Sequence, residues 1–288
     1  MKELVLIVNP ISGKGRGPVL ADQLQEYLQA VGLSATRFDW HKLNDLDDFV
    51  SGLSTERVER LLLFGGDGTL NRVLNAGLNL QIPIQMIPCG SGDGFMRSLN
   101  AGPKGKNNWA EALAKEPERM DLVECNGHRF ANVAGLGFDA EVALAFSRAE
   151  RRGLSGYVRQ VLGLWPESLN TRFRIQMDDQ EEEEHQAWIL ALANGQQWGN
   201  EVYVAPFARP DDGLLDVLML RKPKWHQAYG LFRALKKGRA HRLIRRTRCK
   251  RIQIERDEAG PIHLDGEPLF TSAMVLTRIL PGAFRLIR

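Results

Sequence analysis

The amino-acid sequence predicts an α/β domain with a doubly wound parallel sheet, followed by a mostly β domain resembling a sandwich. In the first part of the chain, apolar strand-like segments alternate with helical segments, which is typical of a parallel sheet covered on both faces. After about residue 118, strand-like segments follow one another, separated by turn dipeptides such as Asn126-Gly127. The length of 288 residues also exceeds the usual size of a single core. We therefore expect an α/β domain at residues 1–118 and a β-rich domain at residues 119–288.

The elements of the first domain are predicted to alternate in order. Its strand-like segments are residues 4–8, 35–38, 61–64 and 84–87. The helical spacing of Leu20, Leu24 and Leu28 predicts a helix after the first strand, and Gly32 is placed to end it. A polar helix is expected in the forties, and another begins near Leu70.

The second domain is predicted to be mostly antiparallel. Its strand-like segments are residues 130–134, 173–177, 188–193, 214–220, 252–254 and 273–280. One helix, roughly residues 225–237, is expected to interrupt them.

Composition excludes several classes of protein. The three cysteines, Cys89, Cys125 and Cys249, are too far apart for a zinc site or a disulfide framework, so they predict reduced thiols and a cytoplasmic protein. No apolar stretch approaches the roughly 20 residues that cross a bilayer. Any contact with a membrane is therefore expected to be peripheral.

The stretch from Arg233 to Arg251 carries many Lys and Arg residues and no acidic residue. It could contact an anionic membrane surface, or its charges could pair with the acidic run from Asp178 to Glu184. Nucleic acid is not expected as a partner, because no recognition motif accompanies the charge. The oligomeric state stays open, a dimer included.

Three glycine-bearing loops follow strands of the first domain: Gly13-Lys14-Gly15, the sequence from Gly65 to Thr69, and the sequence from Gly90 to Gly94. Glycines let a backbone approach an anion closely, and the start of a helix offers unpaired N–H groups, so Gly65 to Thr69 suits phosphate. Asp67 within that loop implies magnesium or proton chemistry. A tight strand-to-helix turn with a capping residue is the alternative.

The ordered motifs resemble those of the diacylglycerol kinase catalytic-domain family, which is related to sphingosine kinases. The resemblance covers nearly the whole chain and has the following motifs in order: Asn9-Pro10-x-Ser12-Gly13, Gly65-Gly66-Asp67-Gly68-Thr69-Leu70-Asn71, Pro88-Cys89-Gly90-Ser91-Gly92, Asp121-Leu122, Asn132, Gly135-Leu136-Gly137-Phe138-Asp139-Ala140, Asn194-Gly195, Asp212-Gly213-Leu214 and Leu264-Asp265-Gly266-Glu267. It implies an ATP-dependent lipid kinase with an NAD-kinase-like fold.

This resemblance also implies the residues of the site. ATP is expected in the cleft between a nucleotide-binding first domain and a lipid-acceptor second domain. The residues expected to bind ATP are Asn9, Gly65, Gly66, Asp67, Gly68, Thr69, Leu70, Asn71, Gly90 and Ser91. Glu267 is expected to be the base that takes the acceptor hydroxyl's proton, with Asp265 and Asp67 placed for Mg²⁺ or its water shell. A simple turn between strands is the alternative at Asp265-Gly266-Glu267.

A second metal site is implied for the segment from Arg209 to Leu214. Arg209 and Leu214 could supply backbone carbonyls and Asp212 a carboxylate. A plain β-turn at Asp212-Gly213 is equally compatible with these residues.

Three positions in two segments depart from the family pattern. The third loop has Asp93-Gly94 where the family usually has Asn-Asp, and Asp39 stands where the family has threonine. The acceptor is therefore open between a diacylglycerol-like and a sphingoid-like lipid. An NAD-kinase-like enzyme and a nucleotide- or lipid-binding regulatory protein with impaired catalysis are the alternatives.

Overall fold

The computed structural model describes residues 2–40, 43–89, 94–99, 109–149 and 154–288. The chain forms two compact units, described separately below. Unit 1 comprises Met1–Asp121 and Pro281–Arg288, and unit 2 comprises Leu122–Leu280. None of the helices in these described ranges is long and apolar enough to span a bilayer.

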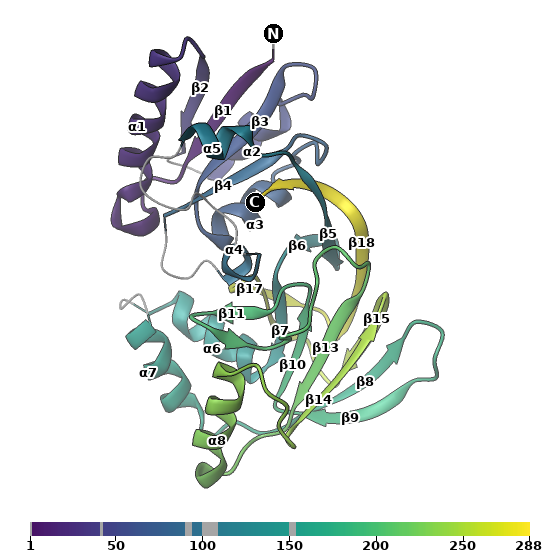
Figure 1. Ribbon diagram of the computed structural model, residues 1–288. Coiled ribbons are helices and arrows are strands. Elements are labelled where there is room, and N and C mark those ends of the chain that lie inside the picture. The colour runs from purple at the N-terminus through teal and green to yellow at the C-terminus, as the bar shows by residue number, and fades with distance from the viewer. Residues whose placement is uncertain (1, 41–42, 90–93, 100–108, 150–153) are drawn as a thin grey trace. The chain divides into compact units, whose positions relative to one another are not determined.

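Unit 1 is built on a parallel sheet (Figure 1). Its strands, in spatial order, are β2 (Ala35–Asp39), β1 (Glu3–Val8), β3 (Val58–Gly65), β4 (Ile84–Pro88) and the C-terminal end of β18 (Met274–Ile287). The helices are η1 (Ser12–Lys14, 3₁₀), α1 (Arg16–Ala30), α2 (Leu43–Ser51), α3 (Asp67–Asn75), α4 (Gly94–Ser98) and α5 (Trp109–Ala114).

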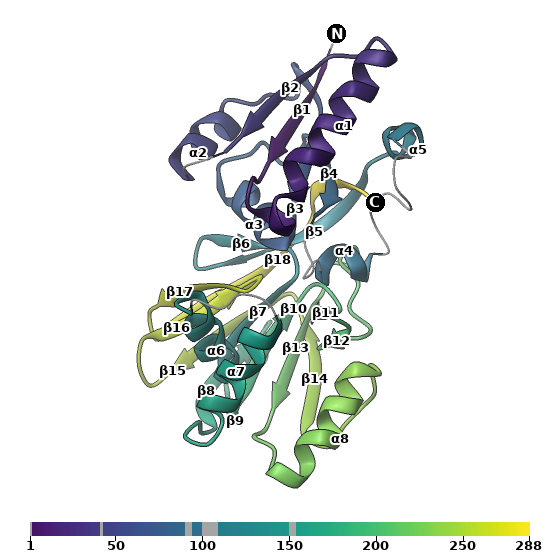
Figure 2. The same cartoon turned by 90° about the vertical axis from the view of Figure 1, so that its left-hand side faces the viewer.

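Both faces of this sheet are covered, which explains why its strands are apolar along their whole length. Leu4, Leu6 and Val8 of β1 pack against α1 and α5. The alternate residues Val5 and Ile7 point to the opposite face and are equally buried. Helices α2 and α3 lie on that side (Figure 2). The doubly wound α/β arrangement predicted from the sequence is confirmed.

Unit 2 is a sandwich of two mainly antiparallel sheets. One sheet contains, in order, β14 (Ile244–Cys249), β13 (Leu215–Leu220), β10 (Ile189–Ala193), β7 (Val133–Gly137), β16 (Gly260–Leu264) and β17 (Glu267–Thr271). The other contains β9 (Glu183–Ala187), β8 (Thr171–Met177), β15 (Arg251–Arg256) and the first part of β18, with β5 (Glu118–Cys125) and β6 (His128–Phe130) joined to β18. A two-stranded ribbon is formed by β11 (Gln197–Gly199) and β12 (Val202–Tyr203).

The six-stranded sheet of unit 2 is buried on both faces. One face shares an apolar core with the other sheet, to which Phe173 and Ile254 contribute. Three helices pack on the second face: α6 (Phe138–Ser147), α7 (Leu154–Leu164) and α8 (Trp225–Lys236). The helix predicted at residues 225–237 is confirmed as α8, but the sequence did not predict α6 and α7, so the prediction of a single helix was wrong. The α6 segment is apolar on nearly all sides, so it lacks the amphipathic period that identifies a surface helix.

The boundary between the units differs from the one expected at residues 118 and 119. The last eight residues, 281–288, also belong to unit 1 rather than to the β-rich half. The physical reason is that β18 pairs antiparallel with β15 up to Arg278 and then parallel with β4, where Leu286 lies opposite Ile84. At the change of partner, the N–H of Gly282 donates to the carboxylate of the buried Asp121 at 2.7 Å.

Candidate functional site

In unit 1, the strands β1, β3 and β4 are adjacent and parallel, so the loops that follow them lie at one edge of the sheet. Ligands of open α/β sheets bind at this edge. The backbone confirms the convergence, because Asn9 N–H donates to the carbonyl of Phe64 at 3.1 Å and Cys89 N–H donates to the carbonyl of Gly65 at 3.2 Å. The glycine loops that the sequence singled out after β1 and β3 are therefore neighbours in space.

Side chains of the first two loops are in direct contact. The amide of Asn9 donates to the hydroxyl of Thr69 at 3.2 Å, and its carbonyl oxygen accepts from the N–H of Ile11 at 3.2 Å. Gly65 is required because a Cβ there would lie 2.1 Å from the hydroxyl oxygen of Thr69. The loop from Gly65 to Thr69 is consequently packed tightly against its own helix.

Gly13 brings the first loop against the end of β4. Its φ of +60° lies in the left-handed region, and a Cβ would approach the carbonyl oxygen of Cys89 to 1.9 Å. No other residue type fits this position without moving backbone. Gly13 thus reflects close packing between the first loop and the end of β4.

The start of α3 supplies the anion-binding geometry expected of this loop. Gly66 is the N-cap residue, and no side chain caps the helix there. The first N–H groups of a helix have no intrahelical partner, and the positive end of the dipole favours a negative ligand. Asp67 in the first turn accepts a hydrogen bond from the N–H of Phe95 in α4 at 3.0 Å, so its carboxylate is held next to the start of α4.

The residues expected to bind ATP lie close together where the structure describes them. Asn9 and Gly65 to Thr69 form the contacts given above. Leu70 is buried and can offer only backbone groups, whereas the side chain of Asn71 accepts from Asn75 within α3 at 3.3 Å. Gly90 and Ser91 lie outside the described residues.

Asp39, which stands where the family has threonine, ends β2 opposite Val8. Its carboxylate accepts from Arg37 Nε at 2.9 Å, and Arg37 also pairs with Asp22. Burial lowers the pKa of Arg37, but hydrogen bonds and charge interactions with these two carboxylates outweigh it and raise that pKa. The negative charge that Asp39 adds near the loops is therefore balanced by a permanent cation.

In unit 2, the predicted base directly follows the tight turn between β16 and β17. Asp265 and Gly266 both have positive φ, at 53° and 88°. The carboxylate of Asp265 accepts three backbone N–H groups, from Ala131 at 3.0 Å, Asn132 at 2.9 Å and Val133 at 3.0 Å. These bonds account for the break between β6 and β7, where the sequence predicted one strand over residues 130–134.

A buried pair, His263 and Asp139, contacts the same turn from the protein interior. The two side chains are 2.7 Å apart between Nε2 and Oδ2 and are almost completely inaccessible, and His263 Nδ1 accepts from the N–H of Gly266 at 3.3 Å. Burial lowers the pKa of His263, but the carboxylates of Asp139 and Asp265 outweigh it and raise the pKa above its ordinary value. The arrangement connects α6, which carries Asp139, to the turn that carries Glu267.

Two glycines of β7 leave no room for a side chain, Gly135 beside this pair and Gly137 beside the neighbouring strand segment at Trp188. A Cβ at Gly135 would lie 2.3 Å from Asp139 Oδ2 and 2.5 Å from His263 Nε2. Gly137 has φ of +78°, and a Cβ there would lie 2.6 Å from the carbonyl oxygen of Trp188. Sequence reasoning used the glycines as a family signature but missed His263. The sequence signal that could have identified His263 is its position two residues before Asp265, next to a possible turn.

Glu267 itself is exposed at the start of β17. Within the described part of the chain its carboxylate makes no hydrogen bond and no ion pair. The turn is therefore held by Asp265 and His263, while the carboxylate of Glu267 remains available to a ligand.

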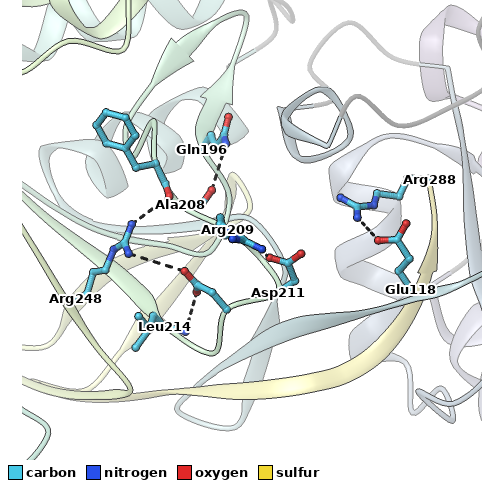
Figure 3. Close-up of polar contacts among 10 residues, drawn as sticks. Glu118, Gln196, Ala208, Arg209, Asp211, Leu214, Arg248 and Arg288 are labelled. Carbon is cyan, nitrogen blue, oxygen red and sulfur yellow. Dashed lines mark hydrogen bonds and ion pairs between the residues drawn. The ribbon is translucent and has the colours of Figure 1, made fainter.

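The loop from Arg209 to Leu214, proposed as a second metal site, is shown in Figure 3. Asp212 accepts from the N–H of Leu214 at 3.1 Å, as in a turn, and Gly213 has φ of +71°. Arg209 turns its side chain to Asp211 at 3.1 Å. Arg248 lies 3.9 Å from Asp212 and 3.2 Å from Asp216.

The two carboxylates of this loop both face arginines. Asp211 pairs with Arg209, and Asp212 lies 3.9 Å from Arg248. Among the described residues there is no cluster of three or more His, Cys, Asp or Glu side chains suited to a metal ion. The metal site at this loop stays a prediction.

Comparison with protein families supports the assignment of both halves. Residues 3–125 match the diacylglycerol kinase catalytic domain. Residues 132–288 match the YegS C-terminal NAD kinase beta sandwich-like domain. The two matches together account for most of the chain.

Full-length relatives agree with these matches. The chain is 33% identical over 234 residues to a "Probable lipid kinase YegS-like" of Pseudomonas aeruginosa, covering 78% of this chain and 75% of the relative. It is 27% identical over 280 residues to a protein of the same description from Chromohalobacter salexigens, covering 91% and 88%. It is 25% identical over 265 residues to a diacylglycerol kinase of Mycobacterium tuberculosis, covering 88% and 85%.

Solved structures show the same fold. A diacylglycerol kinase from Bacillus anthracis is similar with a TM-score of 0.75 and 21% identity, over 99% of this chain and 96% of that one. An NAD kinase from Archaeoglobus fulgidus in complex with ATP is similar with a TM-score of 0.57 and 16% identity, over 100% and 94%. From its matched domains and its relatives, the chain belongs to the YegS-like lipid kinases of the diacylglycerol kinase catalytic-domain family.

Proposed function

We propose that this protein is an ATP-dependent lipid kinase that transfers the γ-phosphoryl group of ATP to a lipid hydroxyl. The observation that carries the proposal is the turn at Asp265-Gly266-Glu267. Its backbone is held by four hydrogen bonds, two from Asn132 and Val133 to one oxygen of Asp265, one from Ala131 to the other, and one from Gly266 to His263. A rigid turn that presents an exposed carboxylate is what a general base needs.

On the donor side, the proposal assigns the phosphates of ATP to the loop from Gly65 to Asn71 and the start of α3. The helix N-terminus and the closely approached backbone support it. Asn9 and Thr69 orient the loop, and Gly90 and Ser91 stay predictions. Magnesium enters with the nucleotide as part of the substrate and neutralises phosphate charge, and Asp67 is the carboxylate of unit 1 placed to face it.

In the proposed transfer, Glu267 accepts the proton of the lipid hydroxyl as that oxygen forms a bond to the γ-phosphorus. The bond between the γ-phosphorus and the bridging oxygen breaks, and ADP leaves with the electron pair. Asp265 acts by positioning Glu267, since both of its carboxylate oxygens are occupied by backbone N–H groups. A second Mg²⁺ at Arg209, Asp212 and Leu214 stays a prediction, and its test is a rise in melting temperature with Mg²⁺ that Asp212→Asn abolishes.

The acceptor is proposed to be diacylglycerol-like or sphingoid-like. Relatives described as diacylglycerol kinases support the first class. The buried, thiol-containing cysteines support a cytoplasmic protein, and the basic stretch at residues 233–251 supports peripheral contact with a membrane.

The experiment is a transfer assay with γ-labelled ATP, magnesium, and a panel of diacylglycerol, sphingosine, ceramide and NAD. Glu267→Gln is expected to lower turnover at least a hundredfold while ATP affinity changes little, because the base acts on the acceptor. Glu258→Gln is the matched control, since Glu258 is also exposed in unit 2 and lies outside the turn.

Each alternative has its own outcome in this assay. Transfer of label to NAD alone would favour an NAD-kinase-like enzyme over a lipid kinase. Nucleotide binding without transfer to any acceptor would favour a regulatory protein. Equal turnover of Glu267→Gln and wild type would show that Glu267 is not the base.

A further inference from the structure

Helix α8 presents three large aromatic side chains to solvent. Trp225, Tyr229 and Phe232 are 61%, 74% and 53% exposed, and their i, i+4, i+7 spacing places them along one side of the helix. Leu231 and Leu235 occupy a different side and are buried in the core below. Among the described residues, Trp225 is the one exposed tryptophan. Soluble surfaces rarely group large apolar side chains in this way without a partner.

The aromatic side of α8 continues onto α7. The rings of Trp225 and Trp165 are stacked with centroids 5.1 Å apart, which joins the start of α8 to the segment just after α7. On α7, Val158 and Leu162 are 45% and 55% exposed and lie one turn apart. Figures 1 and 2 show α7 and α8 on the same side of the six-stranded sheet. We call the exposed side chains of residues 158, 162, 225, 229 and 232 the aromatic face.

The segment that contains α8 carries positive charge only. No Asp or Glu occurs from Val217 to Ile254. Part of the basic stretch is used internally, because Arg248 pairs with Asp216 and Arg251 with Asp179. The exposed Lys and Arg side chains of residues 217–254 that make no ion pair within the described residues are Arg221, Lys224, Arg233, Lys237, Arg239, Arg242, Arg245 and Lys250.

Three arginines, Arg221, Arg242 and Arg245, line a cavity of about 540 Å³ near the start of α8. Asn170, which also lines the cavity, accepts from the N–H of Lys222, a residue of the segment that leads into α8, at 2.9 Å. Glu184 lines the cavity too, 3.9 Å from Arg172. The balance of charge is therefore positive, and a phosphate group is the ligand that clustered guanidinium groups bind well.

We propose that the aromatic face and the arginine-lined cavity form a docking surface for a bilayer that contains anionic phospholipid. The rings would enter the interfacial region, where Trp and Tyr are favoured, and the cations would face lipid phosphates. Charge decides between a bilayer and a second copy of this chain. Pairing two such faces would bring like charges together, which opposes association.

Docking is distinct from phosphoryl transfer. It rests on the proposed function only in that we expect docking to hold the enzyme at the membrane, where its lipid acceptor is found. It also narrows the membrane contact from the whole basic stretch to α8, the end of α7 and the cavity. Docking requires no nucleotide, so it can be tested without catalysis.

The test is co-sedimentation of the full chain with vesicles of phosphatidylcholine, with and without phosphatidylglycerol, in the absence of ATP. The wild type is expected to bind the anionic vesicles, less so as salt is raised. Tyr229→Ser with Phe232→Ser is expected to weaken binding at least about tenfold. Phe207→Ser is the matched control, because Phe207 is 73% exposed outside the aromatic face. Equal melting temperatures verify that the variants fold.

Two further measurements separate the parts of the surface. Quenching of tryptophan fluorescence by bromine-labelled lipid should be lost in Trp225→Phe, which keeps an apolar ring and still binds. Arg221→Gln with Arg242→Gln should remove most of the preference for phosphatidylglycerol.

Four results would overturn the proposal. The first two are failure of the wild type to bind anionic vesicles and unchanged binding by the Tyr229→Ser, Phe232→Ser variant. The third is a wild-type dimer that becomes a monomer in this variant. The fourth is an activity of this variant that falls equally toward a soluble short-chain acceptor and toward an acceptor in vesicles. If the protein binds vesicles but phosphorylates no lipid, the docking proposal stands and the proposed kinase function is refuted.

Discussion

At the scale of single residues, steric and electrostatic constraints explain most of the motif glycines and buried polar groups. Gly65 leaves room for Thr69, Gly13 for Cys89, and Gly135 for the pair of Asp139 and His263. Such positions tolerate no Cβ because the neighbour is backbone or a hydrogen-bonded side chain.

Gly135→Ala is expected to destabilise the protein by about 1–3 kcal/mol, since the new methyl group must separate His263 from Asp139. Gly163→Ala is the control: nothing lies within 4 Å of a Cβ there, and alanine in a helix should be neutral or stabilising. Urea unfolding measures both. Equal stability of Gly135→Ala and wild type would contradict the close packing.

Cys249 should resist thiol reagents until the protein unfolds. Burial, with the carboxylates of Asp178 and Asp216, raises the pKa of Cys249 to about 12. The neutral thiol is favoured in the folded state, so its contribution to stability is complete below the unfolded pKa of about 8.5 and is lost as pH rises toward the folded value. Mass spectrometry after iodoacetamide treatment at mildly alkaline pH measures labelling, and rapid labelling of the native protein would contradict this placement.

At the scale of elements, the turn between β16 and β17 is the feature that tertiary contacts define most strongly. The carboxylate of Asp265 accepts from the distant backbone N–H groups of residues 131–133, and His263 joins the turn to the distant Asp139. Two substitutions test the two supports separately.

Asp265→Asn is expected to lower the free energy of unfolding by about 1–3 kcal/mol, because an amide NH₂ would face backbone donors that need an acceptor. The measurement is made without magnesium. If stability stays unchanged and only magnesium-dependent turnover falls, Asp265 is a metal ligand and not a support of the turn.

His263→Gln is expected to reduce kcat about tenfold or more, since a small displacement of Glu267 misaligns the base. The KM for ATP should change little, because the proposed nucleotide residues lie in unit 1. His185→Gln is the matched control, a half-buried histidine of unit 2 paired with Glu183. A rise in KM for ATP with kcat unchanged would refute the positioning role.

At the scale of the whole molecule, the chain returns to unit 1 at its end. Phe284, Leu286 and Ile287 are buried there, next to β4. The last strand therefore belongs to the stability of the first unit, although it follows the second in sequence.

Deleting residues 281–288 is expected to destabilise unit 1 by more than about 4 kcal/mol, since three large side chains lose their burial. Hydrogen exchange should show faster opening in β1, β3 and β4 than in β10 and β13. Deleting only Arg288, whose surface ion pair with Glu118 is drawn in Figure 3, should change stability by no more than about 1 kcal/mol. Equal loss of protection in both units would contradict the assignment.

The sequence by itself determined the fold class, the four parallel strands of the first half, and the glycine loop from Gly65 to Thr69. These follow from local chemistry, because apolar runs, helical periods and glycines act within a few residues. It also allowed a turn at Asp265-Gly266 as an alternative, which the structure has directly before Glu267.

Only the tertiary structure decided the rest. Helices α6 and α7, the pair of His263 and Asp139, the return of β18 to unit 1, and the exposure of the rings on α8 depend on which distant segments pack together. The sequence does not show whether an apolar residue is buried or exposed. It also does not show whether a carboxylate binds the backbone or faces a ligand. Contacts between distant segments make those distinctions, which is why Asp265 and Glu267, two residues apart, have different surroundings.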